Sequence, residues 1–285
     1  MQPIPPAPYG HSSYARPATP IRYAQRIVTP DGASLATFVY GPESISLHEL
    51  LGNDPVLALH GNGGSHATFV KVIDRLSSAG LGVIAFDSRA QGQSTRGSSP
   101  LTYELMAADA ITVLDALDVT AAHVVGHSDG GIEALLLARD HASRTLSIVA
   151  GGANLTPEGV VDEWDMEGSI AANHAWEHWT LGGDVPDEVD LSLLPSAADA
   201  QRSAELLQLM VVEPRIDATS LASITCPACV LVGEHDCITQ EETSAIAGAI
   251  PRARLVVVPG VGHSLPRQAP DSVSCQVLVN VLLAR

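Results

Sequence analysis

A serine in a glycine-rich turn is the residue of this sequence whose surroundings first suggest chemistry. Residues 126–130 read Gly-His-Ser-Asp-Gly and fit the pattern G-x-S-x-G, with Ser128 at its centre. The pattern alone is weak, because a chain rich in glycine and serine often matches it by chance. Its context is more specific, because the run 123–125 predicts a strand before it and the residues from Ile132 onward lie in a predicted helix. Such a strand-to-helix turn exposes a serine hydroxyl at the end of a sheet, which indicates nucleophilic catalysis.

A serine hydroxyl needs a general base to become nucleophilic at neutral pH, and the base needs an acid that orients it. In this arrangement the acid and then the base follow the serine along the chain, each on a loop after a late strand. Asp236 lies shortly after the apolar run 230–232, and His263 shortly after the run 256–258. We therefore predict Asp236 as the acid and His263 as the base, with Glu234 as the alternative acid.

Two backbone N–H groups must stabilise the oxyanion of the tetrahedral intermediate. One comes from the residue after the nucleophile, here Asp129, and the other from the loop after an early strand. The sequence His-Gly-Asn-Gly-Gly at 60–64 is such a loop, and its glycines let the backbone approach a substrate closely. We predict the N–H of Asn62 as the second donor, with Gly61 and Gly63 as alternatives. A phosphate-binding loop is disfavoured, because the Lys-Ser/Thr ending and the G-x-G-x-x-G spacing are both missing there.

These residues need a scaffold that brings distant loops together, and the order of apolar runs predicts one. Short apolar runs alternate with segments of helical spacing, which is typical of a mostly parallel α/β sheet flanked by helices. Residues 29–32 (Thr-Pro-Asp-Gly) predict a turn within an opening antiparallel hairpin. The predicted strands are 22–29, 34–40, 55–61, 81–86, 122–126, 146–150, 228–233 and 255–259, and the predicted helices are 69–79, 102–117, 130–139, 240–250 and 271–283.

The alternation is interrupted once, between residues 155 and 220, where the pattern is helical and no clear buried strand occurs. The simplest organisation is one α/β core, formed by residues 22–154 and 221–285, with a helical insertion at 155–220. Residues 1–21 are rich in proline and predict an extended lead-in to the core.

Five segments match known motifs, and none of them is specific alone. They are HGNGG (60–64), FDSRAQGQS (86–94), GHSDGG (126–131), GEHD (233–236) and GVGHSLP (260–266). In this order they resemble the α/β-hydrolase superfamily, in its cap-bearing, esterase-like serine hydrolase form. The resemblance implies a sheet of about eight strands with a helical cap inserted after the sixth. It also implies a hydrolase that needs no cofactor and no metal, with the triad and the oxyanion donors at the positions predicted above.

The sequence departs from the family pattern at Ala90, where relatives often have glycine. We expect the loop around Ala90 to brace the site rather than to react, so this departure leaves the predicted activity in place. The serine at position 128 separates the chain from haloalkane dehalogenase and epoxide hydrolase relatives, which use an aspartate nucleophile.

The charge of the chain excludes several classes of partner. The 285 residues include 15 Lys+Arg and 32 Asp+Glu, for a formal net charge of −17. Nucleic acids and anionic membrane surfaces both attract basic faces, so neither is expected as a partner.

No transmembrane run and no secretory signal are evident. The four cysteines all lie in the last quarter of the chain, which is no disulfide framework and favours a reducing cytoplasm.

The insertion suggests what kind of substrate is bound. Residues 155–220 contain 14 Asp+Glu and, as bases, only Arg202 and Arg215. An acidic cap favours neutral or cationic substrates, although a solvated acidic face is the simpler interpretation. The three tryptophans of the chain lie here and either line an apolar pocket or pack inside the cap. They are Trp164, Trp176 and Trp179.

Two further spacings have simpler structural interpretations. His174 and His178 are four residues apart, as metal ligands on a helix can be, but no third ligand accompanies them, so no metal is predicted. Cys226 and Cys229 form a C-x-x-C that enters a strand rather than a helix, so packing is favoured over redox chemistry.

The sequence as a whole predicts a serine hydrolase that cleaves small carboxylic esters through an acyl-enzyme. Cleavage of C–C or amide bonds by the same triad is the alternative within enzymes. Ligand binding without chemistry is the alternative outside them, because a fold does not imply a function.

Overall fold

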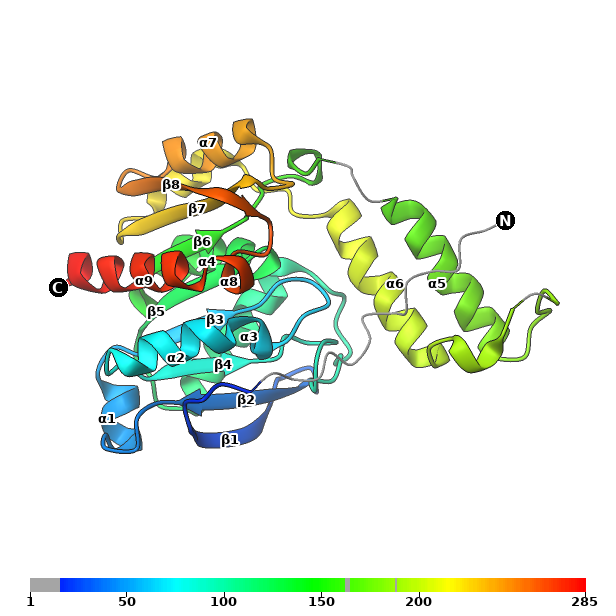
Figure 1. Ribbon diagram of the computed structural model, residues 1–285, viewed down its shortest axis with the longest axis horizontal. Coiled ribbons are helices and arrows are strands. Elements are labelled where there is room, and N and C mark those ends of the chain that lie inside the picture. The colour runs from blue at the N-terminus through cyan, green and yellow to red at the C-terminus, as the bar shows by residue number, and fades with distance from the viewer. Residues whose placement is uncertain (1–15, 162–164, 188) are drawn as a thin grey trace.

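An eight-stranded sheet forms the centre of the protein in the computed structural model, which describes residues 16–161, 165–187 and 189–285 (Figure 1). The strand order is β1-β2-β4-β3-β5-β6-β7-β8. β2 pairs antiparallel with both β1 and β4, and the other pairs are parallel. The strands are β1 (Ile21–Val28), β2 (Ser34–Tyr40), β3 (Val56–Leu59), β4 (Val83–Phe86), β5 (Ala122–His127), β6 (Thr145–Gly151), β7 (Ala228–His235) and β8 (Ala253–Gly262).

Helices cover both faces of the sheet because the central strands are apolar on both sides. In β3, Leu57 and Leu59 join one buried cluster, and Val56 and Ala58 join the other. The first cluster includes α3 (Tyr103–Ala116), α4 (Asp129–Asp140) and α7 (Gln240–Ala249). The second includes α2 (Val70–Ser78) and α9 (Pro270–Ala284). Period-two alternation within continuous apolar runs thus produces the two layers of helices, and the predicted α/β class is confirmed.

The predicted hairpin is present, with Gly32 at φ +87° in its turn and the N–H of Thr29 bonded to the carbonyl of Ala33. Two short helices were not predicted. α1 (Leu47–Gly52) begins at a capping box formed by Ser46 and Glu49, a signal that the sequence does contain. The other, α8 (Leu265–Gln268), is a single turn after β8.

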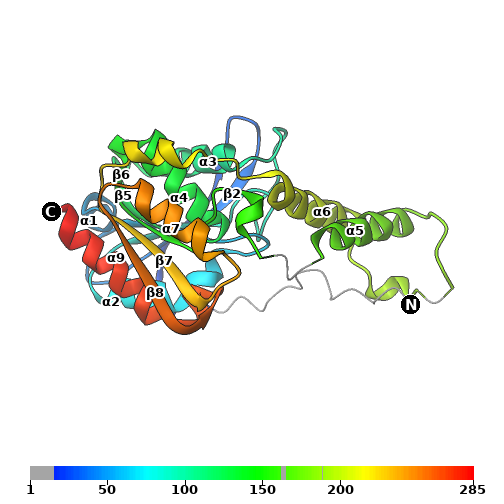
Figure 2. The ribbon, with the colours of Figure 1, turned by 90° about the horizontal axis from the view of Figure 1, so that it is seen from above.

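The segment between β6 and β7 is helical, as predicted. Its two long helices, α5 (Met166–Thr180) and α6 (Ala197–Val212), lie side by side and project from one side of the sheet (Figures 1 and 2). Trp176 of α5 is buried. The proposed division at 154/155 and 220/221 and the role of this segment as a cap stay predictions. Of the predicted lead-in, residues 1–15 lie outside the described residues, as does Trp164.

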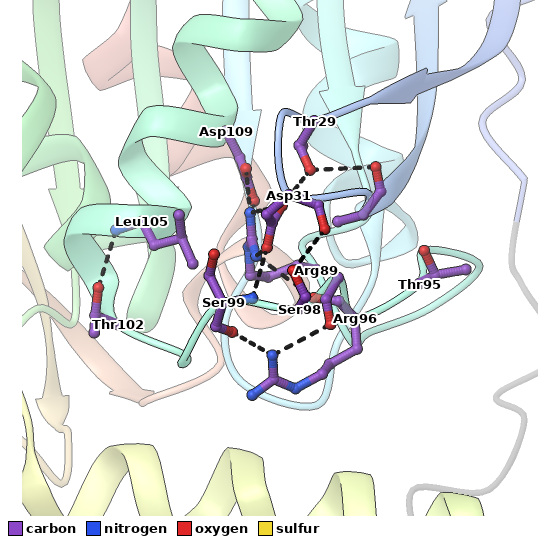
Figure 3. A network of polar contacts seen from close by, with 12 residues as sticks. Thr29, Asp31, Arg89, Thr95, Arg96, Ser98, Ser99, Thr102, Leu105 and Asp109 are labelled. Atoms are coloured by element: carbon purple, nitrogen blue, oxygen red, sulfur yellow. Dashed lines mark hydrogen bonds and ion pairs between the residues drawn. The ribbon is translucent and has the colours of Figure 1, made fainter.

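A buried arginine ties the loop after β4 to two other elements (Figure 3). The Arg89 guanidinium donates to both carboxylate oxygens of Asp109 on α3, at 2.7 and 2.6 Å, and to Asp31 in the β1–β2 turn at 2.9 Å. These contacts lower the pKa of Asp31. The next residue, Ala90, has φ +62°, a conformation that favours glycine. These contacts fix the loop to α3 and to the hairpin, and its role in bracing the site stays a prediction.

No helix in the described part of the chain is long and apolar enough to cross a membrane.

Candidate active site

Ser128 lies in a strained turn between β5 and α4. Its φ is +56°, which is unusual for a residue with a side chain. The flanking glycines make the turn possible, because a Cβ on Gly126 would lie 1.8 Å from the carbonyl oxygen of Gly130. A Cβ on Gly130 would lie 2.1 Å from the carbonyl oxygen of Leu59 in β3. The turn is held on its other side by a 2.7 Å bond from the Ser128 N–H to the carbonyl of Gly151.

The structure brings Ser128, His263 and Asp236 together. The Ser128 Oγ lies 3.0 Å from Nε2 of His263. Nδ1 of the same ring lies 2.7 Å from Oδ1 of Asp236, whose side chain is only 1 % exposed. Asp236 and His263 directly follow β7 and β8, and they meet because parallel strands end at the same edge of the sheet. Glu234, the alternative acid, accepts instead from the N–H of Gly260 at 2.7 Å.

Burial and pairing set the ionisation of the acid and the base. Burial tends to raise the pKa of Asp236, but the bond and the charge of His263 together with the N–H groups of Ile238 and Gly233 outweigh burial, so the pKa is lowered. Burial tends to lower the pKa of His263, and the carboxylate of Asp236 together with the thiol of Cys237 raises it above its ordinary value. The arrangement therefore favours an ionised Asp236 and stabilises a protonated His263.

The loop at 60–64 passes directly beside the serine. A Cβ on Gly61 would lie 2.8 Å from Cβ of Ser128, so only glycine lets the chain come this close. The side chain of Asn62 donates from Nδ2 to Oδ2 of Asp129 and to the carbonyl of Leu206 on α6, both at 3.0 Å. One amide thus links the early loop, the turn of the serine and the helical segment.

The carboxylate of Asp129 is a feature that the sequence analysis missed. It is buried and also accepts from the hydroxyl of Tyr103 at 3.1 Å. Burial raises its pKa to about 6, against the lowering effect of Asn62 and Tyr103. The sequence motif identifies only the backbone N–H of Asp129, because nothing in it indicates which way the side chain points.

A pocket opens onto Ser128, Asp129 and His263. Its polar lining includes Tyr103 and Glu213, which no sequence signal singled out. Of the described residues, no lysine or arginine and neither Trp176 nor Trp179 is in the lining. The apolar part of the lining comes from residues before α5, on α5 and α6, and after β7, namely Val160, Val161, Met166, Met210 and Ile238.

The remaining motifs lie outside this pocket. His174 is mostly exposed and lies 3.7 Å from Glu177, its neighbour on α5. Cys226 and Cys229 are free thiols, and Cys229 is buried in β7 among core residues. Their contacts fit the packing interpretation of the C-x-x-C spacing.

The chain is similar to several hydrolases of known name. It is 27% identical over 261 residues to the rhodomycin D methylesterase of Streptomyces sp. (strain C5), with 74% of this chain and 85% of that protein covered. It is 28% identical over 244 residues to a putative carbamate hydrolase of Variovorax paradoxus, with 78% and 90% covered. Its fold matches that of an esterase from Exiguobacterium antarcticum with a TM-score of 0.69 and 21% identity, over 91% of this chain and all of that one.

A family model described as "Alpha/beta hydrolase family" matches residues 56–274, which span most of the sheet and all three residues of the Ser128 site. Together with the fold, this match shows that the chain is a hydrolase and belongs to the alpha/beta hydrolase family.

Proposed function

We propose that this protein is a serine esterase that cleaves small carboxylic esters through an acyl-enzyme intermediate. The observation that carries the proposal is the continuous contact from Ser128 Oγ through His263 to Asp236, at 3.0 and 2.7 Å. This contact opens onto an apolar pocket. Similarity to a methylesterase supports an ester as the substrate.

In the proposed acylation step, Ser128 Oγ attacks the ester carbonyl while Nε2 of His263 accepts its proton. Asp236 holds the ring proton on Nδ1 and stabilises the imidazolium. The alcohol then leaves with a proton donated by His263, and the acyl group stays on the serine. Water deacylates the enzyme by the same route in reverse.

The oxyanion of both tetrahedral intermediates is assigned to the backbone N–H groups of Asn62 and Asp129. The approach of the 60–64 loop to Ser128 supports this assignment. Each such donor contributes about 3 kcal/mol to the transition state. The bond between the Asn62 side chain and Asp129 keeps the two donor loops in register.

The pocket favours neutral or cationic substrates, because Asp129 and Glu213 line it and its described lining contains no lysine or arginine. Fixed carboxylates raise the local concentration of cations and lower that of anions. The residues contributed by 160–161, α5 and α6 support a cap role for the helical segment, which would then select substrates by size.

The test is hydrolysis of p-nitrophenyl esters from acetate to decanoate, with methyl esters in parallel. Wild type should turn over the short esters, and Ser128→Ala should lose about 10⁴–10⁶-fold in kcat. Ser78→Ala, an exposed serine on α2, is the matched control and should behave as wild type. Among esters of matched size, one whose alcohol part carries a trimethylammonium group should react faster than the one with a neutral tert-butyl group. The ester whose alcohol part carries a carboxylate should react slowest.

A serine-directed fluorophosphonate separates the alternatives. Labelling at Ser128 without ester turnover would indicate that the same residues cleave a C–C or amide bond instead of an ester. Neither labelling nor turnover, in a folded protein, would support binding without chemistry and end the esterase proposal.

A further inference from the structure

A third side chain with metal affinity lies beside the acid and the base. Cys237 follows Asp236 directly and lines the same pocket. One potential ligand atom each from Asp236, Cys237 and His263 all lie within 4.8 Å of one another, and they form the one such group of three in the described ranges. No step of the proposed esterase reaction forms a bond to the thiol or transfers a proton through it.

These three side chains are a ligand set that Zn²⁺ prefers. Thiolate, imidazole and carboxylate bind zinc at about 2.0–2.3 Å, and three protein ligands leave one position for water. Two ligand atoms on one tetrahedral zinc lie about 3.5 Å apart, by the same bond lengths. Small side-chain rotations would therefore close the observed group around an ion.

The backbone already holds the group in place. The N–H of Val161 donates to the carbonyl of Cys237 at 2.7 Å, and the N–H of Ile238 donates to Oδ1 of Asp236 at 3.1 Å. Gly152 lies beside His263 and Asp236, and a Cβ on Gly152 would lie 2.9 Å from Cε1 of His263. A side chain at this position would therefore clash with the ring, and glycine lets the backbone pass close to His263.

We propose that Asp236, Cys237 and His263 form an inhibitory site for a thiophilic divalent cation, with Zn²⁺ as the best fit. This regulation rests on the proposed function, because it works by removing the base. On binding, the Cys237 thiol loses its proton to solvent, and the thiolate, one Asp236 oxygen and one ring nitrogen bind the ion. A metal on Nε2 blocks proton transfer from Ser128. A metal on Nδ1 leaves the ring proton on Nε2, so the ring again accepts no proton from the serine.

The site is tested first without reference to catalysis, by titration with Co²⁺. Thiolate-to-Co²⁺ charge transfer in the near ultraviolet should appear in wild type and equally in Ser128→Ala, which keeps all three ligands. It should disappear in Cys237→Ser and Cys237→Ala. Cys275→Ser, which removes an exposed thiol on α9, is the matched control and should keep the band.

The inhibitory role is tested by initial rates on a short p-nitrophenyl ester across a ZnCl₂ series, with EDTA to reverse the effect. Each variant is compared with its own metal-free rate. The zinc concentration for half inhibition should rise at least about tenfold in Cys237→Ser, since even the loss of an outer partner of a metal ligand costs that much affinity. Cys275→Ser should keep the wild-type sensitivity.

The outcomes separate the two proposals. A missing Co²⁺ band, or a band that persists in both Cys237 variants, overturns the metal site. A Cys237-dependent band without inhibition of an active esterase overturns the regulation. A protein with the band but without ester turnover contradicts the proposed function and leaves the metal site standing.

Discussion

Nε2 of His127 donates a hydrogen bond to the backbone carbonyl of His263, with 2.7 Å between the two atoms. Because a carbonyl only accepts, the ring proton of His127 is on Nε2. Burial lowers the pKa of His127 to about 4, so the ring is neutral at neutral pH. His127 directly precedes Ser128, and its side chain therefore connects the strand of the nucleophile to the loop of the base.

This contact predicts that His127 positions His263. His127→Phe should lower kcat about tenfold, the value of one lost hydrogen bond, with little change in KM. His127→Gln keeps a side-chain N–H and should recover most of the loss. The measurement is kcat and KM of both variants on one ester. An equal loss of kcat in His127→Phe and His127→Gln would show that the ring only fills space.

The acid is predicted to be Asp236 and not Glu234. Asp236→Asn should lower kcat about 10⁴-fold, because an amide favours the wrong tautomer of His263. Glu234→Gln is the matched control, since Glu234 bonds the N–H of Gly260 and should keep near wild-type kcat. The reverse pattern of losses would transfer the role of acid to Glu234.

The pH profile should reflect the raised pKa of His263. The base must be neutral to accept the serine proton, so activity is lost as pH falls through its pKa. Because Asp236 and Cys237 raise that pKa, the acid limb of kcat/KM should have its midpoint above the ordinary value of 6.5. In Asp236→Asn the midpoint should move to lower pH. A wild-type midpoint at or below pH 6.5 would contradict the prediction that Asp236 and Cys237 raise the pKa of His263.

Glu133 of α4 is predicted to destabilise the protein. It is buried, and neither carboxylate oxygen has a hydrogen-bond partner among the described residues. Burial and the nearby Asp129 raise its pKa well above 4.5. Glu133→Met, which removes the unpaired oxygens at similar volume, should increase the free energy of unfolding by about 1–3 kcal/mol.

The gain from Glu133→Met should depend on pH. The folded protein holds this proton more tightly than the unfolded chain, so the wild type loses stability as pH rises above 4.5 toward the folded-state pKa. Urea unfolding at pH 5 and pH 8 should therefore show the larger gain at pH 8. If the gain in unfolding free energy became smaller as pH rises, Glu133 could not be a buried carboxyl that is protonated in the folded protein.

Arg89 is predicted to stabilise the core through charge pairing. Its side chain is fully buried between Asp31 and Asp109. Arg89→Met leaves these carboxylates without their partner and should cost about 3–5 kcal/mol of unfolding free energy. Arg202→Met breaks the exposed pair with Asp199 on α6 and should cost at most about 1 kcal/mol. Similar losses in the two variants would argue against a special role for the buried arginine.

The sequence by itself determined the order and class of the elements. Continuous apolar runs gave strands buried on both faces, and the glycines of G-x-S-x-G predicted the turn whose close contacts at Gly126 and Gly130 exclude side chains. Asp236 and His263 were identified because they follow late strands, and parallel strands end at one edge of the sheet. These are local patterns and a topological rule, and both can be recognised without knowing any distance.

Only the tertiary structure decided which side chains from different elements meet at that edge. Asn62 contacts Asp129 and α6, Glu213 joins the pocket, and Cys237 lies beside His263. No periodicity encodes these contacts, because each depends on how separate loops pack and on which rotamer the packing leaves. The sequence therefore indicated where the chemistry lies, and packing between distant segments decided what surrounds it.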